Sequence, residues 1–286
     1  MTCLLLALRE QGLVNIHREA LMRWTCLALA LVLVAATNAP AQRTRHLDHL
    51  NWMEVEELVP MAIQTVFLPV GTVEAHGVGP NGADNLVPEA LAVYLAEQLD
   101  GLIAPTISYG VNTSIDEYAG TFGIAPELLE VLAKQVMTGL AKTGFRNIIV
   151  LNGHGPNFAP LDAAAIEVFR ETEARVMVIN WWSATADLSE EVWGEQGGHA
   201  GLNENAALMV VARDDVLPEL YRPEQATPFN DAWSAYPFPT TIGLYTPGEG
   251  YLDFDRAKAE RYFNRVKEEM LAIVRDVITK WDAGGH

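Results

Sequence analysis

The chain has 286 residues, half of them apolar, with 19 basic and 37 acidic side chains and a formal net charge of −18. This length is enough for one large domain or two small ones. Because proteins bind nucleic acids and anionic lipids through lysine and arginine, the acidic balance excludes both as expected partners.

The first 41 residues are typical of a secretory signal peptide. Met22 begins a short basic start, residues 26–36 form an apolar run, and residues 39–41 read Ala-Pro-Ala, as at a cleavage site. The run is too short to span a bilayer, which needs roughly 20 apolar residues, and a buried core helix is disfavoured because nothing amphipathic surrounds it. We expect translation to start at Met22 and cleavage to follow residue 41. Residues 42–286 would then form a single periplasmic or secreted domain without a membrane partner.

Both cysteines, Cys3 and Cys26, lie within this leader. The mature chain would have no thiol, which excludes disulfides and cysteine-ligated metal sites. Removal of the leader takes away three basic and two acidic side chains, so the formal net charge becomes −19. The mature fold is therefore expected to rely on its hydrophobic core alone.

Segments that predict strands and helices alternate along the chain from residue 63. Apolar runs predict strands covered on both faces, and amphipathic runs bounded by proline or glycine predict helices; Pro88 is expected at the first position of one helix. In chain order we predict strand 63–71, helix 88–101, strand 102–108, helix 125–144, strand 147–151, helix 160–174, strand 174–180, helix 203–212, loops with short strands over 213–253, and helix 255–283. The alternation implies right-handed crossovers and a mostly parallel sheet between helical layers, an α/β fold.

Two glycine-rich motifs directly follow predicted strands. EAHG (residues 74–77) comes after the strand at 63–71, and NGHG (residues 152–155) comes after the strand at 147–151. Ligands bind to open parallel sheets at the carboxyl ends of the strands. Both motifs are therefore predicted at the end of the sheet where a functional site is expected.

Three of the seven histidines, His76, His154 and His199, lie inside the predicted domain, and each is next to a glycine. One such histidine alone would more often be a turn or core residue. Three together favour a functional centre, because a ligating imidazole needs a fixed orientation and glycine lets the backbone make room for it.

Carboxylates accompany these histidines. Glu74 and His76 are two residues apart, so in extended backbone both side chains point to one face, and Asp84 and Glu204 follow the glycine motifs. Two histidines and three carboxylates suit Zn, Mn or Fe, and five ligands with one able to bridge indicate two divalent metal ions. His199 would then remain for acid–base chemistry. The predicted metal ligands are Glu74, His76, Asp84, His154 and Glu204.

Four motifs, taken in their order along the chain, resemble those of the creatininase (creatinine amidohydrolase) family. They are EAHG with a following aspartate, GT, NGHGPN and GGHAGLNEN. The resemblance covers residues 66–208, about half of the chain, with weaker echoes at 242–255. It implies a three-layer α/β/α sandwich with a mostly parallel central sheet, a dinuclear metal site, and hydrolysis of the C–N bond of a small cyclic or linear amide. It also implies a homo-oligomer, such as a hexamer.

Carried over by position, the resemblance implies that Asp84 bridges the two metal ions and that His199 is catalytic or orients the substrate. The chain also departs from creatininase itself: Pro156 stands where creatininase has a glutamate ligand. We expect Glu204 to replace that ligand, as the HAG…E pattern of other members indicates. A tryptophan just before GGH is absent, so creatinine is not the expected substrate.

The expected reaction is metal-assisted hydrolysis, in which a bridging water attacks the amide carbonyl and His199 donates a proton to the leaving nitrogen.

Three residues are predicted to contact the substrate, namely Thr121, Trp181 and Trp182. A turn before the next helix is an equal alternative for Thr121, and a buried core position is at least as expected for one of the tryptophans. Asn152 and Asn157 are expected to hold the loop around His154 through backbone hydrogen bonds.

A function of a different class stays open, a non-catalytic periplasmic protein that binds a small molecule or a metal ion on the same fold. The missing ligand at Pro156 favours this alternative, whereas His199 disfavours it because a metal trap does not need that residue. A metallophosphatase is less consistent with the sequence, because no arginine or lysine accompanies the motif loops to bind a phosphate.

Overall fold

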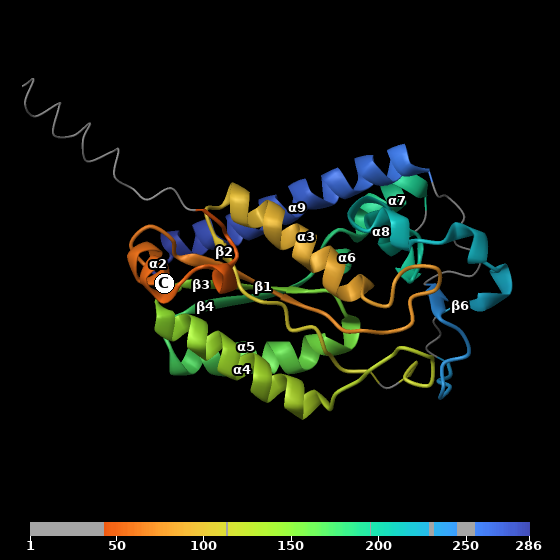
Figure 1. Cartoon of the computed structure of the whole chain (residues 1–286), viewed down its shortest axis with the longest axis horizontal. Coiled ribbons are helices and arrows are strands. Elements are labelled where there is room, and N and C mark those ends of the chain that lie inside the picture. The colour runs from red at the N-terminus through yellow and green to blue at the C-terminus, as the bar shows by residue number, and fades with distance from the viewer. Residues whose placement is uncertain (1–42, 113, 195, 229–231, 245–254) are drawn as a thin grey trace, which may run out of the picture. The chain divides into compact units, whose positions relative to one another are not determined.

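A four-stranded parallel sheet forms the centre of the protein, whose structure here is a computed structural model (Figure 1). The strands lie in the order β2-β1-β3-β4. They are β1 (Thr65–Val70), β2 (Leu102–Ile103), β3 (Asn147–Asn152) and β4 (Arg175–Asn180). Val70 pairs with Asn152, and Asn152 pairs with Asn180. The carboxyl ends of three strands are therefore level at one edge of the sheet.

The structure describes residues 43–112, 114–194, 196–228, 232–244 and 255–286. Residues Thr44–His286 form one compact unit. The predicted signal peptide, and most of the weaker echo of the family at 242–255, lie outside the described residues. Among the helices that are described, none combines the length and the apolar character needed to cross a membrane.

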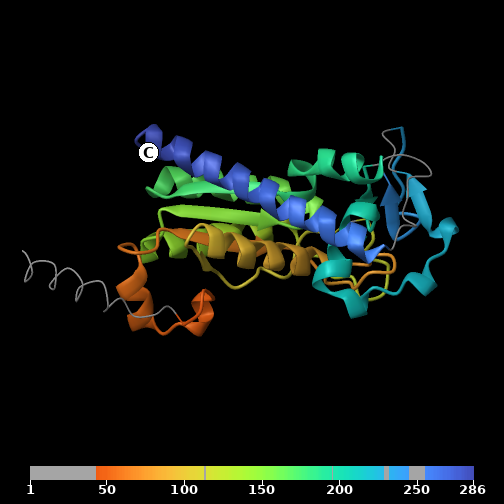
Figure 2. The same ribbon diagram turned by 90° about the horizontal axis from the view of Figure 1, so that it is seen from above.

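Helices cover both faces of the sheet. Figure 1 shows one helical layer on each side, and Figure 2 shows that the last helix crosses the length of its layer. The first layer contains α3 (Ala83–Gln98), α8 (Leu202–Val211) and α9 (Arg256–Ala283), and the second contains α4 (Pro126–Thr143) and α5 (Phe158–Glu171). In β1, Phe67 packs into the first layer while Val66 and Leu68 pack into the second. The predicted three-layer α/β/α sandwich is confirmed.

The remaining described elements surround the carboxyl edge and the amino-terminal part of the unit. They are η1 (Leu47–His49), α2 (Trp52–Leu58), η2 (Gly155–Asn157), α6 (Trp181–Ala184), α7 (Ala186–Trp193), β5 (Gly198–His199), η3 (Arg213–Asp215), η4 (Pro218–Leu220), η5 (Pro223–Gln225), β6 (Ala226–Pro228) and β7 (Ile242–Leu244). Strands β5, β7 and β6 form a small second sheet. The pattern of apolar and amphipathic segments in the sequence did not predict α2, α7 or β5.

The predicted boundaries of α3 were wrong. The helix begins at Ala83, five residues before the predicted start, and Pro88 lies inside it. Proline has no N–H, so it leaves the carbonyl of Asp84 without its usual helical partner. That carbonyl presses against the ends of β1 and β3, where a Cβ at Gly71 would lie 2.2 Å and one at Gly153 1.9 Å from the oxygen. Glycine at both positions allows this approach, which places Asp84 at the ends of the strands.

The strand predicted over 102–108 is also shorter than expected. Only Leu102–Ile103 pairs as β2, and a single bridge joins Val70 to Ile107. Pro105 lies between them and cannot donate to the ladder, which interrupts the pairing. The chain after β2 therefore runs as a loop along the edge of the sheet, towards the side chains of the predicted site.

Candidate metal centre

All six predicted ligand and catalytic side chains meet at the carboxyl edge of the sheet. They come from the loop after β1, the first turn of α3, the loop after β3, strand β5 and the first turn of α8. Their donor atoms form three overlapping groups, each with all atoms within 4.8 Å of one another. The groups are Glu74, Asp84 and His154; His76, Asp84 and Glu204; and Glu74, His76 and His199.

The first group is formed by Glu74, Asp84 and His154, all of which are buried. The Nδ1 atom of His154 lies 3.1 Å from Glu74 Oε1 and 2.9 Å from Asp84 Oδ2. Its Nε2 atom lies 2.6 Å from the carbonyl oxygen of Val111. A carbonyl only accepts, so Nε2 carries the hydrogen and Nδ1 is the atom available to a ligand.

The second group is formed by His76, Asp84 and Glu204. The Nε2 atom of His76 lies 2.7 Å from Glu204 Oε2, and its Nδ1 atom lies 3.9 Å from Asp84 Oδ1. The backbone N–H of Ala200 also donates to Glu204 Oε2, at 2.7 Å. Asp84 thus directs Oδ2 to the first group and Oδ1 to the second, which is the arrangement that a bridging carboxylate needs.

This donor set fits divalent cations. Glu74 Oε1, Asp84 Oδ2 and His76 Nδ1 are buried, and none of them has a hydrogen-bond partner among the described residues. Unpaired buried polar atoms, and charged ones above all, are costly unless a partner or a metal ion compensates them. Imidazole nitrogens and carboxylate oxygens are ligands that zinc, manganese and iron accept. The donor atoms of the two groups that share Asp84 are therefore of the kind that bind divalent cations.

The electrostatics of these ligand side chains are dominated by burial and by neighbouring charges. Burial acts to lower the pKa of His76, but Glu204, Asp84 and Glu74 outweigh it and raise this pKa to about 9. Burial also opposes the charged form of His154, yet Glu74 and Asp84 hold its pKa well above the usual value. Burial and the charge of Glu74 raise the pKa of Asp84. Burial acts to raise the pKa of Glu74, but the surrounding imidazoles, first that of His154, lower it to about 2.

These pKa values predict that metal affinity rises with pH. Because the pKa of His76 is raised to about 9, its imidazole is cationic at pH 7 as long as no cation is bound, and the raised pKa of His154 acts in the same direction. A cation must displace these protons, so its apparent affinity should increase by up to about tenfold per pH unit for each proton released, between pH 6 and pH 8. Calorimetric titration with Zn²⁺ or Mn²⁺ in buffers of different ionisation enthalpy would count the released protons. Affinity independent of pH would contradict the assignment of these ligands.

His199 differs from the other histidines of the centre. Its Nε2 atom lies 3.0 Å from the carbonyl oxygen of Ala75, so this nitrogen donates, while Nδ1 lies 3.4 Å from Glu74 Oε1. The ring packs edge-on against that of His76, with the ring centroids 4.6 Å apart. Its side chain is 20% exposed, whereas that of His76 is fully buried. His199 can therefore be reached from outside the centre.

A cavity of about 180 Å³ opens onto the centre. One wall carries the carboxylates and imidazoles, and the other is mainly apolar. Besides Glu74, Asp84, His154, His199 and Glu204, the lining residues are Ser114, Ile115, Gly153, Gly155, Pro156, Trp182, Gly198 and Phe238. No lysine or arginine is among these described lining residues.

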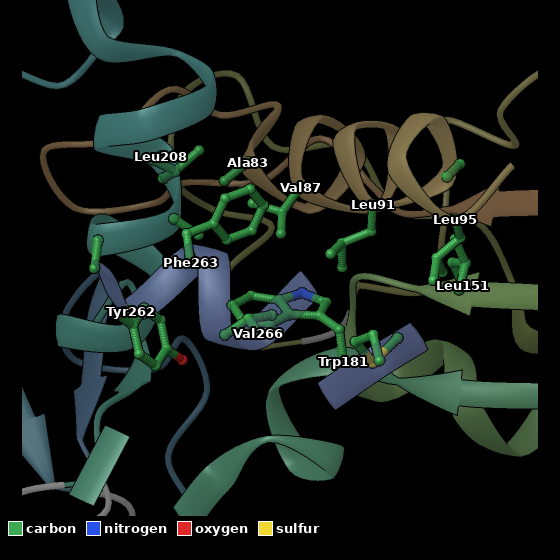
Figure 3. Close-up of a cluster of buried hydrophobic side chains, with 14 of the residues drawn as sticks. Ala83, Val87, Leu91, Leu95, Leu151, Trp181, Leu208, Tyr262, Phe263 and Val266 are labelled. Carbon is green, nitrogen blue, oxygen red and sulfur yellow. The ribbon is translucent and has the colours of Figure 1, made fainter. Parts of the chain in front are cut away.

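Of the three residues predicted to contact the substrate, only Trp182 lines the cavity. Trp181 is buried in the hydrophobic core of the first helical layer, 2% exposed, and Figure 3 shows it beside Val266. The chain turns into α6 directly after β4, and neighbouring side chains of a helix point in different directions. Thr121 accepts a hydrogen bond from the N–H of Ala75 at 2.9 Å, so it supports the ligand loop and does not line the cavity.

The two asparagines hold the loop of His154, as predicted. Asn152 accepts from the N–H of His154 at 3.2 Å and donates to its carbonyl at 2.7 Å. Asn157 accepts from the N–H of Val111 at 2.8 Å and donates to the carbonyl of Gly71 at 3.0 Å. Asn152 therefore stabilises the loop of His154 itself, and Asn157 connects this loop to the segments after β1 and β2.

The sequence did not identify two further residues at the centre. Asn112 donates to Glu74 Oε2 at 2.6 Å, and Phe238 closes part of the apolar wall. The only local signal for Asn112 is its place in a loop after a predicted strand at the same edge of the sheet. Phe238 follows from no local pattern, because its segment is placed by bonds to Ser114 and Tyr118.

A buried cluster of imidazoles and carboxylates at the carboxyl ends of the strands of an α/β/α sandwich is typical of a metal-binding α/β protein. The family model described as "Creatininase: Creatinine amidohydrolase" matches residues 48–274. The chain therefore belongs to the creatininase family, and this confirms the predicted family.

Curated relatives are similar in sequence to part of this chain. The "Mycofactocin precursor peptide peptidase" of Mycolicibacterium smegmatis is 30% identical over 173 residues, which is 58% of this chain and 64% of that protein, just under two thirds. The "Creatinine amidohydrolase" of Pseudomonas putida is 24% identical over 184 residues, 58% of this chain and 71% of that protein.

Solved structures share the fold. A mutant creatininase of "Zn-Zn type" has a TM-score of 0.71 at 20% identity, and "Creatininase Mn" has a TM-score of 0.70 at 21% identity. Each similarity covers 82% of this chain and 98% of the other chain. At this identity the comparison shows that the fold is the same.

Proposed function

We propose that the chain hydrolyses the C–N bond of a small amide with two divalent cations, either Zn, Mn or Fe. One cation would be held by Glu74, Asp84 and His154, and the other by His76, Asp84 and Glu204. The observation that carries this proposal is the carboxylate of Asp84, which directs one oxygen into each of two buried donor groups. Glu204 would supply the ligand that Pro156 cannot.

Two bound divalent cations would provide a water molecule of lowered pKa and polarise the amide carbonyl. The residues of the chain provide the proton transfer. The Nε2–H of His199 is engaged by the carbonyl of Ala75, so Nδ1 is the atom free to take up a proton and deliver it to the leaving nitrogen. The partial exposure of His199 on the cavity supports this role.

The charge of the cavity supports a neutral or cationic substrate. Its charged lining residues are acidic or histidine, and the sequence has no lysine or arginine between Arg45 and Lys134 or between Arg175 and Arg213. Apart from the two proposed cations, a carboxylate or phosphate on the substrate would therefore meet no positively charged side chain from these segments. The Pseudomonas putida relative is named for a small amide substrate.

The family resemblance also supports a homo-oligomer. Light scattering would measure the mass of this oligomer.

Metal content and turnover together test the proposal. Residues 42–286, purified without a histidine tag, should bind about two cations per chain by plasma mass spectrometry. A matched set of acetanilide, its para-aminomethyl derivative and its para-carboxylate would then probe charge, with the carboxylate cleaved roughly tenfold or more slowly, because like charges close together cost several kcal/mol. Two cations without turnover of any amide would favour the non-catalytic alternative. No cation, after both Zn²⁺ and Mn²⁺ have been offered, would refute the metal centre.

We also propose that the chain is exported to the periplasm or secreted. Support comes from the basic start at Met22, the apolar run at 26–36 and the Ala-Pro-Ala sequence at 39–41. Expression from Met22 in a Gram-negative host should yield a periplasmic protein whose amino-terminal sequence begins at Gln42. A cytoplasmic product that keeps its leader would show that the segment is not a signal peptide.

A further inference from the structure

We infer that Asn112 is a positioning residue for one of the two cation sites, acting together with the backbone carbonyl of Val111. The inference rests on the proposed function, because it concerns how the chain prepares the cation ligands. It assigns residues 110–112 as the support of the site formed by Glu74, Asp84 and His154. The site that contains His76 and Glu204 would have a separate support.

Asn112 determines which oxygen of Glu74 is available. Its Nδ2 atom donates to Glu74 Oε2 at 2.6 Å, and both side chains are buried. The Oδ1 atom of Asn112 accepts from the N–H of Ile115 at 3.4 Å, which orients the amide so that Nδ2 faces Glu74. One carboxylate oxygen is thereby occupied, and Oε1 remains unpaired and 3.1 Å from His154 Nδ1. Glu74 is prepared to bind a cation through a single oxygen.

The neighbouring carbonyl prepares the second ligand of the same site. Val111 accepts the Nε2–H of His154 at 2.6 Å and so leaves Nδ1 as the ligating atom. Hydrogen bonds of this kind fix the tautomer and ring orientation of histidine ligands. Two consecutive residues therefore hold Glu74 and His154 in the geometry that one cation requires.

The segment is itself tied to the end of β1. Asn157 accepts from the N–H of Val111 and donates to the carbonyl of Gly71. The N–H of Gly110 donates to Thr72 Oγ1 at 3.2 Å. These bonds hold residues 110–112 beside the strand that carries the EAHG loop.

The second donor group is supported differently. Glu204 receives the N–H of Ala200, four residues earlier in the chain, and His76 contacts Glu204 directly. Among the hydrogen bonds of the described residues, none joins either side chain to residues 110–112. Removal of the Asn112 amide should therefore weaken one cation site and leave the other.

The experiment measures cation content and affinity for Asn112→Ala, with Asn147→Ala as the matched control. Asn147 is also buried, and its amide donates to Thr65 Oγ1 at the opposite end of the sheet. In Asn112→Ala one of the two cations should bind roughly 10- to 100-fold more weakly, the usual effect of losing a hydrogen bond to a metal ligand. Asn147→Ala should keep both cations, whatever its melting temperature. In Asn112→Ala, but not in Asn147→Ala, the absorption spectrum of the Co²⁺-substituted protein should lose the contribution of one site.

The possible results separate this inference from the proposed function. Two cations of unchanged affinity in Asn112→Ala would overturn the inference and leave the dinuclear centre intact. Equal loss of cations in Asn112→Ala and Asn147→Ala would reduce Asn112 to a general structural role. A wild-type protein without cations would refute the proposed function itself. If Asn112→Ala does not fold, Asn112→Leu keeps the side-chain volume, lacks the donor and serves for the same measurement.

Discussion

Replacement of Asp84 by alanine is expected to remove both cations and to reduce amide hydrolysis by roughly a thousandfold or more. Asp84 belongs to both donor groups, with Oδ2 2.9 Å from His154 and Oδ1 3.9 Å from His76. Loss of the shared carboxylate would leave each group with two ligands. The stabilisation that bound cations give to the transition state amounts to several kcal/mol, which corresponds to this loss of rate. Plasma mass spectrometry and kcat for a confirmed amide substrate would measure the two effects.

Two variants show whether the effect of Asp84→Ala is specific. Glu204→Gln alters only the second group and should lose one cation while the other stays bound. Asp116→Ala removes an exposed carboxylate from a nearby loop and should retain both cations and full turnover. Retention of two cations by Asp84→Ala would exclude a bridging role for this residue.

Replacement of His199 by alanine is expected to lower kcat by about 10²- to 10⁴-fold, the range of general acid–base catalysis, with cation content unchanged. The expectation follows from the geometry of the ring, whose Nε2 is engaged by Ala75 while Nδ1 faces the centre. Its partial exposure on the cavity distinguishes it from the buried ligands. Steady-state kinetics and metal analysis on the same preparation would check both parts.

The metal analysis also decides between two roles for His199. Its Nδ1 atom forms a third donor group with Glu74 and His76, so loss of a cation in His199→Ala would identify it as a ligand. Full turnover in the variant would remove it from the mechanism altogether. His46→Ala, a change at an exposed histidine outside the centre, should leave both measurements at the wild-type value.

The order of the glycine and histidine motifs was enough to place most of the candidate centre. EAHG and NGHG each follow an apolar run, and such runs form adjacent parallel strands whose ends are level, as the pairing of Val70 with Asn152 shows. All strands of a parallel sheet have their carboxyl ends at one edge, so the local patterns predicted His76 and His154 at the same edge. The three-layer fold followed from the same alternation.

Other features depended on contacts between residues far apart in the sequence. The start of α3, and with it the position of Asp84, depends on how closely its first turn packs against Gly71 and Gly153. The different places of Trp181 and Trp182 arise where β4 passes directly into a helix.

The sequence by itself determined which chemical groups the centre has and at which edge of the sheet they gather. These follow from residue types and from the periods of strands and helices, which are local properties. The tertiary structure alone decided how those groups are aimed: Asn112 reaches Glu74 across 38 positions of the chain, and Val111 reaches His154 across 43. Such hydrogen bonds depend on how separate loops pack at the sheet edge, and no local pattern encodes that packing.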